Sequence, residues 1–148
     1  MSDQTTTVKG LIKTLEDGRD GFAKAGERLQ NDSASDVSRK FQEFSSRRGA
    51  MADELRRGAG LSDYAVEDGT VAGAVHRGWI AVKDALTGDS PSAVISAAEQ
   101  GEDHAKSKFR DALEDKSLSA DVRAIVQRHA VEVEAAHDYV SSLKHANR

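Results

Sequence analysis

The C-terminal half of the chain carries carboxylate and imidazole side chains at a spacing typical of a metal site. Glu134 and His137 form a Glu-x-x-His motif, and residues three apart on a helix share one face, so both can bind the same ion. Glu102 stands between Ala98 and Ala105 on a stripe that is otherwise apolar. If the two segments fold back on each other, Glu102 and Glu134 become near neighbours, with His137 one turn further along. The three side chains are therefore a candidate site for iron or manganese.

The N-terminal half does not supply the ligands that would complete a di-metal centre. Such a centre needs a carboxylate from a third helix and a second Glu-x-x-His motif from a fourth. Glu16 and Asp17 offer the carboxylate, but residues 34–57 contain no histidine, and their apolar stripe is interrupted by Arg48. A guanidinium is permanently charged and only donates hydrogen bonds. An inward Arg48 therefore repels a metal ion and neutralises carboxylates by itself.

These residues support two interpretations, neither of which assigns a catalytic residue. We favour a buried polar network in the place where related bundles hold metal, and its predicted members are Glu16, Asp17, Arg48, Glu102, Glu134 and His137. Such a network fixes the register of the helices, and removal of one member costs about 3–5 kcal/mol because it strands a partner. The alternative is a single-metal site formed by Glu102, Glu134 and His137. Further histidines are expected at the surface or at the edge of an apolar stripe, namely His104, His129 and His145.

The stretch His76-Arg77-Gly78-Trp79 holds the only tryptophan of the chain. Trp79 continues an apolar stripe formed by Val71, Val75, Val82 and Leu86. We interpret the stretch as structural, with a buried indole ring that fixes a crossover helix at about residues 70–87 to the rest of the protein. As the alternative, His76 and Arg77 form an anion-binding or general-base pair, but no nucleophile lies nearby in sequence.

Four longer segments carry apolar residues at the spacing of amphipathic helices. The predicted helices span roughly residues 5–30, 34–57, 91–116 and 120–145. Ser119, and Ser90 followed by Pro91, are typical helix starts. Short links within the first and second pairs favour antiparallel hairpins, whereas about thirty residues between the pairs allow the second and third helices to run parallel. This pattern predicts an all-α, ferritin-like four-helix bundle in one domain that spans residues 1–148.

The composition favours helices and argues against several classes of partner. The 148 residues include a single proline, and 31% of them are charged, with a formal net charge of -4. Because acids and bases are interleaved, no basic stripe is available for nucleic acid and no polybasic run for a membrane surface. Without cysteine, disulfides and thiolate ligands are excluded. We expect no leader, and the sequence contains no apolar run of about 18 residues. We expect a cytoplasmic protein, and the small glycine and alanine faces favour a homo-oligomer, most simply a homodimer.

Several motifs resemble those of a known bacterial family. The segments are AGAVHRGWIAVKDALTGDS, TLEDGRDGF, AAEQGEDHAKSKFRDAL, RRGAMADEL and EAAHDYV, and the likeness covers about residues 8–144. They resemble a family of uncharacterised ferritin-like four-helix-bundle proteins that carries a domain of unknown function and is named after a Pseudomonas member. The resemblance implies a ferritin-like fold and a soluble bacterial protein, and it implies no substrate.

Two functions from different classes follow from these patterns. The first is a non-enzymatic helical bundle that acts by association with itself or with a protein partner and needs no cofactor, with a stress-associated role as one option. The second is a ferritin-like metal-binding protein with oxidase or storage activity. Arg48 and the lack of histidine in residues 34–57 favour the first.

Overall fold

Four helices account for most of the chain in a computed structural model, which describes residues 4–30, 35–65 and 91–146. The helices are α1 (Gln4–Gln30), α2 (Ser35–Gly58), α4 (Pro91–Leu113) and α5 (Ala120–Ala146). Within these three ranges the protein forms no strand, so the prediction of an all-α four-helix protein is confirmed. The predicted crossover helix at about 70–87, with His76, Arg77, Gly78 and Trp79, lies outside the described residues.

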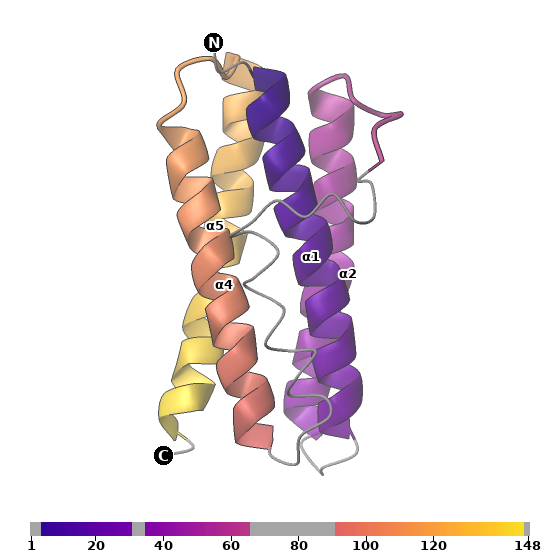
Figure 1. Cartoon of the computed structure of the whole chain (residues 1–148), viewed down its shortest axis with the longest axis vertical. Coiled ribbons are helices and arrows are strands. Elements are labelled where there is room, and N and C mark those ends of the chain that lie inside the picture. The colour runs from indigo at the N-terminus through magenta and orange to yellow at the C-terminus, as the bar shows by residue number, and fades with distance from the viewer. Residues whose placement is uncertain (1–3, 31–34, 66–90, 147–148) are drawn as a thin grey trace.

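The helices pair as two antiparallel hairpins that lie side by side (Figure 1). α1 packs against α2 and α4, and α5 packs against α4 and α2, so α1 and α5 stand diagonally opposite each other. α1 and α5 run down the view of Figure 1, whereas α2 and α4 run up it. α2 and α4 are therefore parallel, as the long link between the pairs predicts.

Local chemistry explains where α2 ends and α5 begins. Gly60 has a positive φ of 71°, and the N–H of Leu61 donates to the carbonyl of Arg56 over 2.7 Å, while Gly60 donates to Arg57 over 3.3 Å. This pair of hydrogen bonds is the glycine-terminated C-cap known as the Schellman motif. At the start of α5, Ser119 Oγ accepts from the N–H of Val122 over 3.2 Å, so the predicted N-cap at Ser119 is confirmed.

The end of α4 differs from the prediction, because the helix stops at Leu113 and not near residue 116. The N–H of Asp115 donates to Ala112 over 3.0 Å, which tightens the final turn. Asp115 Oδ1 then accepts from the backbone N–H of Ser117 at 2.8 Å, a local turn that competes with helix. Arg123 of α5 donates to the carbonyls of Leu113 (2.7 Å) and Asp115 (2.6 Å) and so caps the helix end.

α1 and α2 make the most extensive of the helix pairings among the described residues, and small residues line part of their contact. A Cβ atom on Gly26 would lie 3.1 Å from the carbonyl oxygen of Ser38. Ser38 Oγ donates to the Gly26 carbonyl over 2.6 Å, and Ser45 Oγ donates to the Arg19 carbonyl over 2.8 Å. Gly26 thus allows close approach of the two helices.

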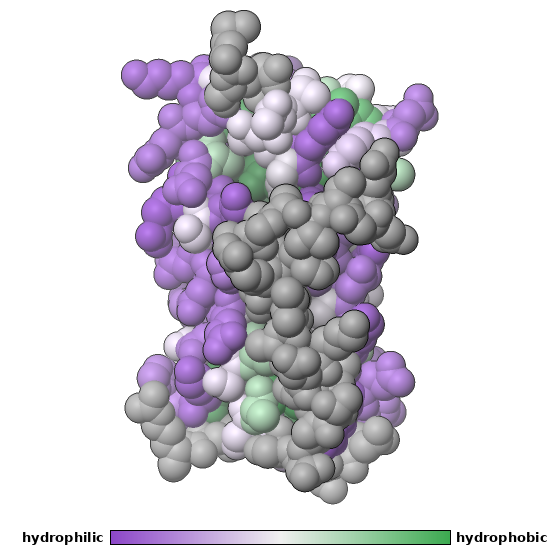
Figure 2. Space-filling view, in the orientation of Figure 1, coloured by the Kyte–Doolittle hydropathy of each residue, from purple (hydrophilic) through white to green (hydrophobic). Residues whose placement is uncertain are grey.

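The core consists of two apolar clusters, one toward each end of the bundle. The first takes the early turns of α1 and α5 and the late turns of α2 and α4, with Leu15, Met51, Leu55, Phe109 and Val126 among its buried members. The second takes the opposite ends of the same helices and is centred on Phe22, Leu29, Phe41, Val94 and Val140. Outside the grey atoms, hydrophilic residues cover most of the face in Figure 2. Among the described residues, none of the helices combines the length and apolar character needed to cross a bilayer.

Candidate functional site

The most deeply buried charges of the described residues form one ion pair between α2 and α4. Arg48 is 2% exposed and Glu102 is fully buried. Arg48 Nη1 donates to Glu102 Oε1 over 2.8 Å, and Nη2 donates to Oε2 over 2.5 Å. Two parallel charge-assisted hydrogen bonds are the strongest arrangement available to a guanidinium and a carboxylate. Both oxygens of this inward carboxylate are therefore already neutralised within the chain.

Two residues of α1, Gly18 and Phe22, contact the Arg48 guanidinium. Gly18 lies against the guanidinium, because a Cβ atom there would be 2.8 Å from Nη1. Phe22, one turn along the same face, places its ring centroid 5.3 Å from Cζ of Arg48. A cation over an aromatic face is favourable, and more so where water is excluded. Residues of three helices thus hold one guanidinium.

The buried ion pair lies at the level where the two core clusters meet. Along α1, Leu15 belongs to the first cluster and Phe22 to the second, with Gly18 between them. Along α4, Ala105 and Ala98 divide in the same way. The polar layer therefore interrupts the apolar core at mid-height, and a helix that slid by one turn would lose the pairing. This agrees with a role in fixing register.

The predicted network was wrong in placing Glu16 and Asp17 beside Arg48. Glu16 accepts instead from Arg56, which also donates to Asp53 Oδ1 over 3.1 Å. Asp17 pairs within its own helix with Lys13, at 3.7 Å. Gly18 is the residue of α1 that faces Arg48, and a side chain one or two positions earlier on a helix points to another side.

Glu134 and His137 also lie outside the core, so the structure does not bring them to Glu102. The Glu134 side chain is 60% exposed, and its oxygen lies 3.8 Å from Lys106 Nζ. His137 places Nε2 at 2.7 Å from Asp103 and Nδ1 at 3.2 Å from Asp138. Ala136, which is buried, takes the inward position that the sequence pattern assigned to His137.

The outward positions of Glu134 and His137 also separate the members of the alternative metal site, Glu102, Glu134 and His137. Glu102 faces the core, whereas the other two side chains flank the outer edge of the α4–α5 contact. The two nitrogens of His137 face different carboxylates on opposite sides of the ring. Within residues 4–30, 35–65 and 91–146, no three histidine, aspartate or glutamate side chains are placed to hold one metal ion.

His129 is buried, so the prediction that it lies at the edge of an apolar stripe is wrong. It is 1% exposed, its Nε2 lies 2.7 Å from Glu54 Oε1 of α2, and its ring meets that of Phe109 at 6.4 Å between centroids. The signal was available, because Val126, His129 and Val133 continue the inward face of α5 at spacings of three and four. The neighbouring Ala130 also fits an apolar stripe, so spacing alone does not decide which of the two residues is buried.

The protonation state of His129 follows from its surroundings. Burial lowers the pKa of His129 below its ordinary value of 6.5, and the hydrogen bond to Glu54 only partly opposes this. The same hydrogen bond lowers the pKa of Glu54, so the carboxylate is ionised and can only accept. The neutral ring therefore carries its proton on Nε2. Its other nitrogen, Nδ1, is buried and has no hydrogen-bond partner among the described residues.

Ion pairs span the contact between α2 and α5 within a groove and beyond one end of it. Arg47 donates to both oxygens of Glu132, over 2.9 and 2.6 Å, and Arg128 donates to Glu54 over 2.9 Å. The groove has a volume of about 280 Å³, and its lining includes Arg48 and the apolar residues Phe44, Met51, Ala135 and Ala136. We call this region, with the contacts of Arg47, Glu54, Arg128, His129 and Glu132, the α2–α5 seam.

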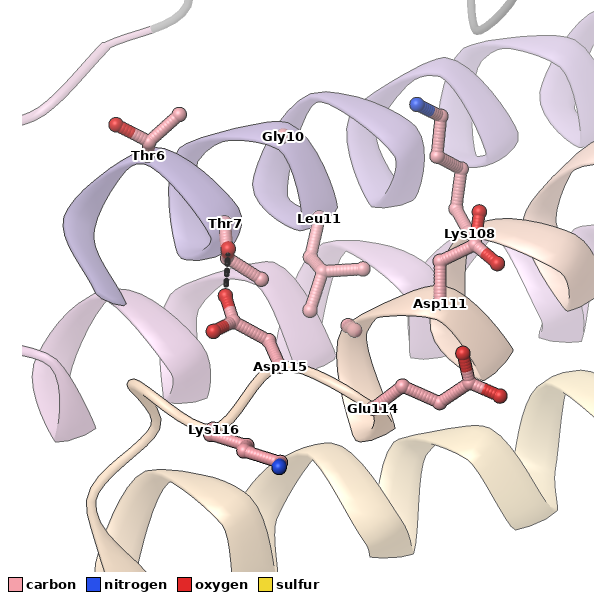
Figure 3. Close-up of a pocket in the computed structure, with 10 residues that line it drawn as sticks. Thr6, Thr7, Gly10, Leu11, Lys108, Asp111, Glu114, Asp115 and Lys116 are labelled. Atoms are coloured by element: carbon pink, nitrogen blue, oxygen red, sulfur yellow. Dashed lines mark hydrogen bonds between the residues drawn. The ribbon is translucent and has the colours of Figure 1, made fainter. Parts of the chain in front are cut away.

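A wider depression of about 510 Å³ lies between the start of α1 and the end of α4 (Figure 3). Thr7 and Asp115 point toward each other across it, and Thr7 Oγ1 donates to Asp115 Oδ2. Lys108 and Asp111 of α4, and Glu114 just after it, line this depression. Charges of both signs thus surround it, and the contact between Thr7 and Asp115 ties the start of α1 to the turn after α4.

Comparison with known protein families identifies the family of this chain. Residues 3–115 match the model of a family described as Domain of unknown function (DUF2383). The chain belongs to this family. No curated protein and no solved structure matches it.

The DUF2383 match covers α1, α2 and α4 and ends before α5 begins. Both members of the Arg48–Glu102 pair therefore lie within the DUF2383 region. The α2–α5 seam is divided by this boundary, because Arg47 and Glu54 lie inside the match whereas His129 and Glu132 lie beyond it.

Proposed function

We propose that this protein is a non-enzymatic, ferritin-like four-helix bundle in which the Arg48–Glu102 ion pair replaces a metal centre. The hydrogen bonding of both Glu102 oxygens to Arg48 carries the proposal. The parallel course of α2 and α4 supports the ferritin-like assignment (Figure 1). On the likeness of its motifs to bacterial proteins, we also propose a bacterial origin and a cytoplasmic location.

The chemistry of arginine makes metal binding at this position unfavourable. A cation at Glu102 would have to displace a guanidinium that does not lose its proton at any physiological pH. The displaced charge would remain beside Phe22 at a position that is almost fully buried, where an unpaired charge is costly. Arg48 therefore supplies the positive charge that a metal ion would otherwise supply to Glu102.

We further propose that the protein functions by association with itself or with a protein partner. Gly18 and Gly26 of α1 are used inside the α1–α2 contact, so association would use an outer surface. Val131 on α5 supports this, since it is 69% exposed and is the large hydrophobic side chain that the described surface leaves uncovered. A homodimer would have twice the chain mass of 15.9 kDa. Light scattering of wild type and Val131→Lys tests this, and a monomeric wild type at tens of micromolar would contradict it.

Elemental analysis tests the metal-free assignment. The protein would be purified without a chelator and without a metal-affinity tag, and then measured for iron, manganese and zinc. We expect far less than one ion per chain, and a melting temperature that millimolar chelator does not change. One or two ions per chain would instead support the ferritin-like metal-binding alternative with oxidase or storage activity.

A further inference from the structure

The α2–α5 seam differs from the α1–α2 contact in what holds it together. α1 and α2 are joined by small residues in close contact and by serine-to-carbonyl hydrogen bonds. α2 and α5 are joined by apolar contacts, such as that between the rings of Phe44 and Tyr139. They are also joined by ion pairs and by the contact of His129 with Glu54, and a groove enters between them. A contact that depends on charge responds to pH more strongly than one that depends on apolar packing.

His129 sits at the buried edge of this seam with half of its hydrogen-bonding capacity unused. Its Nε2–H donates to Glu54, and Nδ1 is buried with no partner in the described part of the chain. A proton added to Nδ1 would create a buried cationic N–H group with no acceptor, which is costly unless the ring reaches water. The helices around it have to move before that can happen.

We propose that His129 is an acid-sensitive contact: proton uptake at Nδ1 opens the α2–α5 seam while the α1–α2 contact stays closed. The opened seam widens the groove, whose lining includes Arg48, and gives water access to the Arg48–Glu102 pair. The α1–α2 contact contains no buried histidine and has no reason to respond in the same pH range.

The charges around His129 set the direction of the response. Glu54 faces it from α2, and Glu132 on α5 also favours the protonated ring, whereas Arg128 and burial oppose protonation. From α4 it meets the uncharged ring of Phe109. Burial is the largest of these effects. The closed seam therefore binds the proton more weakly than an open seam does, and acid favours opening.

Thiol labelling can measure the opening directly, because the chain contains no cysteine. Ala136→Cys places a reporter that is 3% exposed in the wall of the groove. Ala135→Cys is the matched control, since the adjacent residue lines the same groove but is exposed. Ala25→Cys reports on the α1 core position, where the side chain is fully buried. A disulfide reagent that reacts at acidic pH would label each variant between pH 7.5 and 5.

The ratio of the Ala136→Cys rate to the Ala135→Cys rate should rise by roughly tenfold for each pH unit below about 6.5, until the closed form itself binds the proton. The labelling rate of Ala25→Cys should not rise in the same way. The rise should disappear with His129→Phe, which keeps an aromatic ring against Phe109 and cannot titrate. It should persist with His137→Gln, which alters a partly exposed histidine away from the seam.

Three outcomes would overturn the proposal. They are a ratio that does not change with pH, a rise that survives in His129→Phe, and a parallel loss of protection at Ala25→Cys, which would indicate unfolding of the whole bundle. If His129→Phe does not fold, the imidazole ¹⁵N spectrum of the wild type decides. We expect the Nε2–H tautomer at pH 7.5. If the His129 imidazole titrates near pH 6.5 while the labelling ratio stays unchanged, protonation is not coupled to opening of the seam, and the proposal is contradicted.

Discussion

Gly18 of α1 and Arg48 of α2 are in direct contact, so close that a methyl group on residue 18 would lie 2.8 Å from Nη1. The guanidinium is the end of a long side chain, but it cannot move aside freely. Its two hydrogen bonds to Glu102 and the ring of Phe22 fix its place. The absence of a side chain at residue 18 is therefore a condition for the buried ion pair.

The first prediction is that Gly18→Ala lowers the free energy of unfolding by about 1–3 kcal/mol, because overpacking displaces Arg48. Gly10→Ala is the matched control, since it lies in the same helix and its Cβ atom would meet nothing within 4 Å. That control should gain up to about 1 kcal/mol from helix propensity. Urea unfolding measures both, and equal effects at the two positions would contradict the geometry.

The second prediction concerns the pair itself. Arg48→Ala should cost about 3–5 kcal/mol, because it leaves Glu102 buried without its cation. The deficit should shrink at mildly acidic pH, where a proton can remove the stranded charge. Replacing both residues, as Arg48→Met with Glu102→Met, should be close to neutral or stabilising, since two apolar side chains need no partner. A double variant as unstable as Arg48→Ala would show that the pair adds stability beyond satisfying its own charges.

The sequence was sufficient to predict the helices and the inward direction of Arg48 and Glu102. Both residues interrupt stripes of large apolar side chains, and such stripes mark the buried face of a helix clearly. Helix ends set by local chemistry, such as the N-cap at Ser119, could also be predicted. The end of α4 could not, because it depends on Arg123 of the following helix.

The partners of the charged residues could not be predicted in the same way. On α5, Val133 and Val140 are compatible with an inward residue at either 136 or 137, and the small Ala136 gives little signal. The error moved His137 into the core and left His129 out of it. On α1, the choice between Glu16 and Gly18 as the neighbour of Arg48 depends on the rotation of one helix against another. That rotation is set by packing across the whole contact, which spacing within one segment does not specify.

The third prediction concerns the turn that ends α2. Gly60→Ala should destabilise the protein by about 1–2 kcal/mol, because the positive φ of 71° brings Cβ close to the following carbonyl oxygen. Space is not the cause, since nothing lies within 4 Å of that Cβ position. Gly60→Asn should be milder, because asparagine tolerates this conformation better than alanine. Thermal unfolding of the two variants would distinguish them, and an equal loss in both would argue against backbone strain.

The last prediction is the pH dependence of global stability. The pKa of His129 is lower in the folded protein than its ordinary value of 6.5, so the unfolded chain binds protons more readily. The stabilisation from this residue is complete above about pH 6.5 and is lost as the pH falls from there toward the lower pKa of the folded state. The pKa values of Glu54 and Glu132 are lowered from 4.5 by hydrogen bonds to His129 and Arg47 respectively. Their contributions are lost in turn as the pH falls below about 4.5.

Two separate decreases should therefore appear when the free energy of unfolding in urea is measured from pH 8 to pH 3. The decrease that begins near pH 6.5 should be absent from His129→Phe, whereas the decrease at lower pH should remain. His137→Gln should retain both, because that side chain is partly exposed to water and pairs with exposed Asp103. A wild-type curve that is flat between pH 7.5 and 5 would show that the buried His129 is not linked to folding.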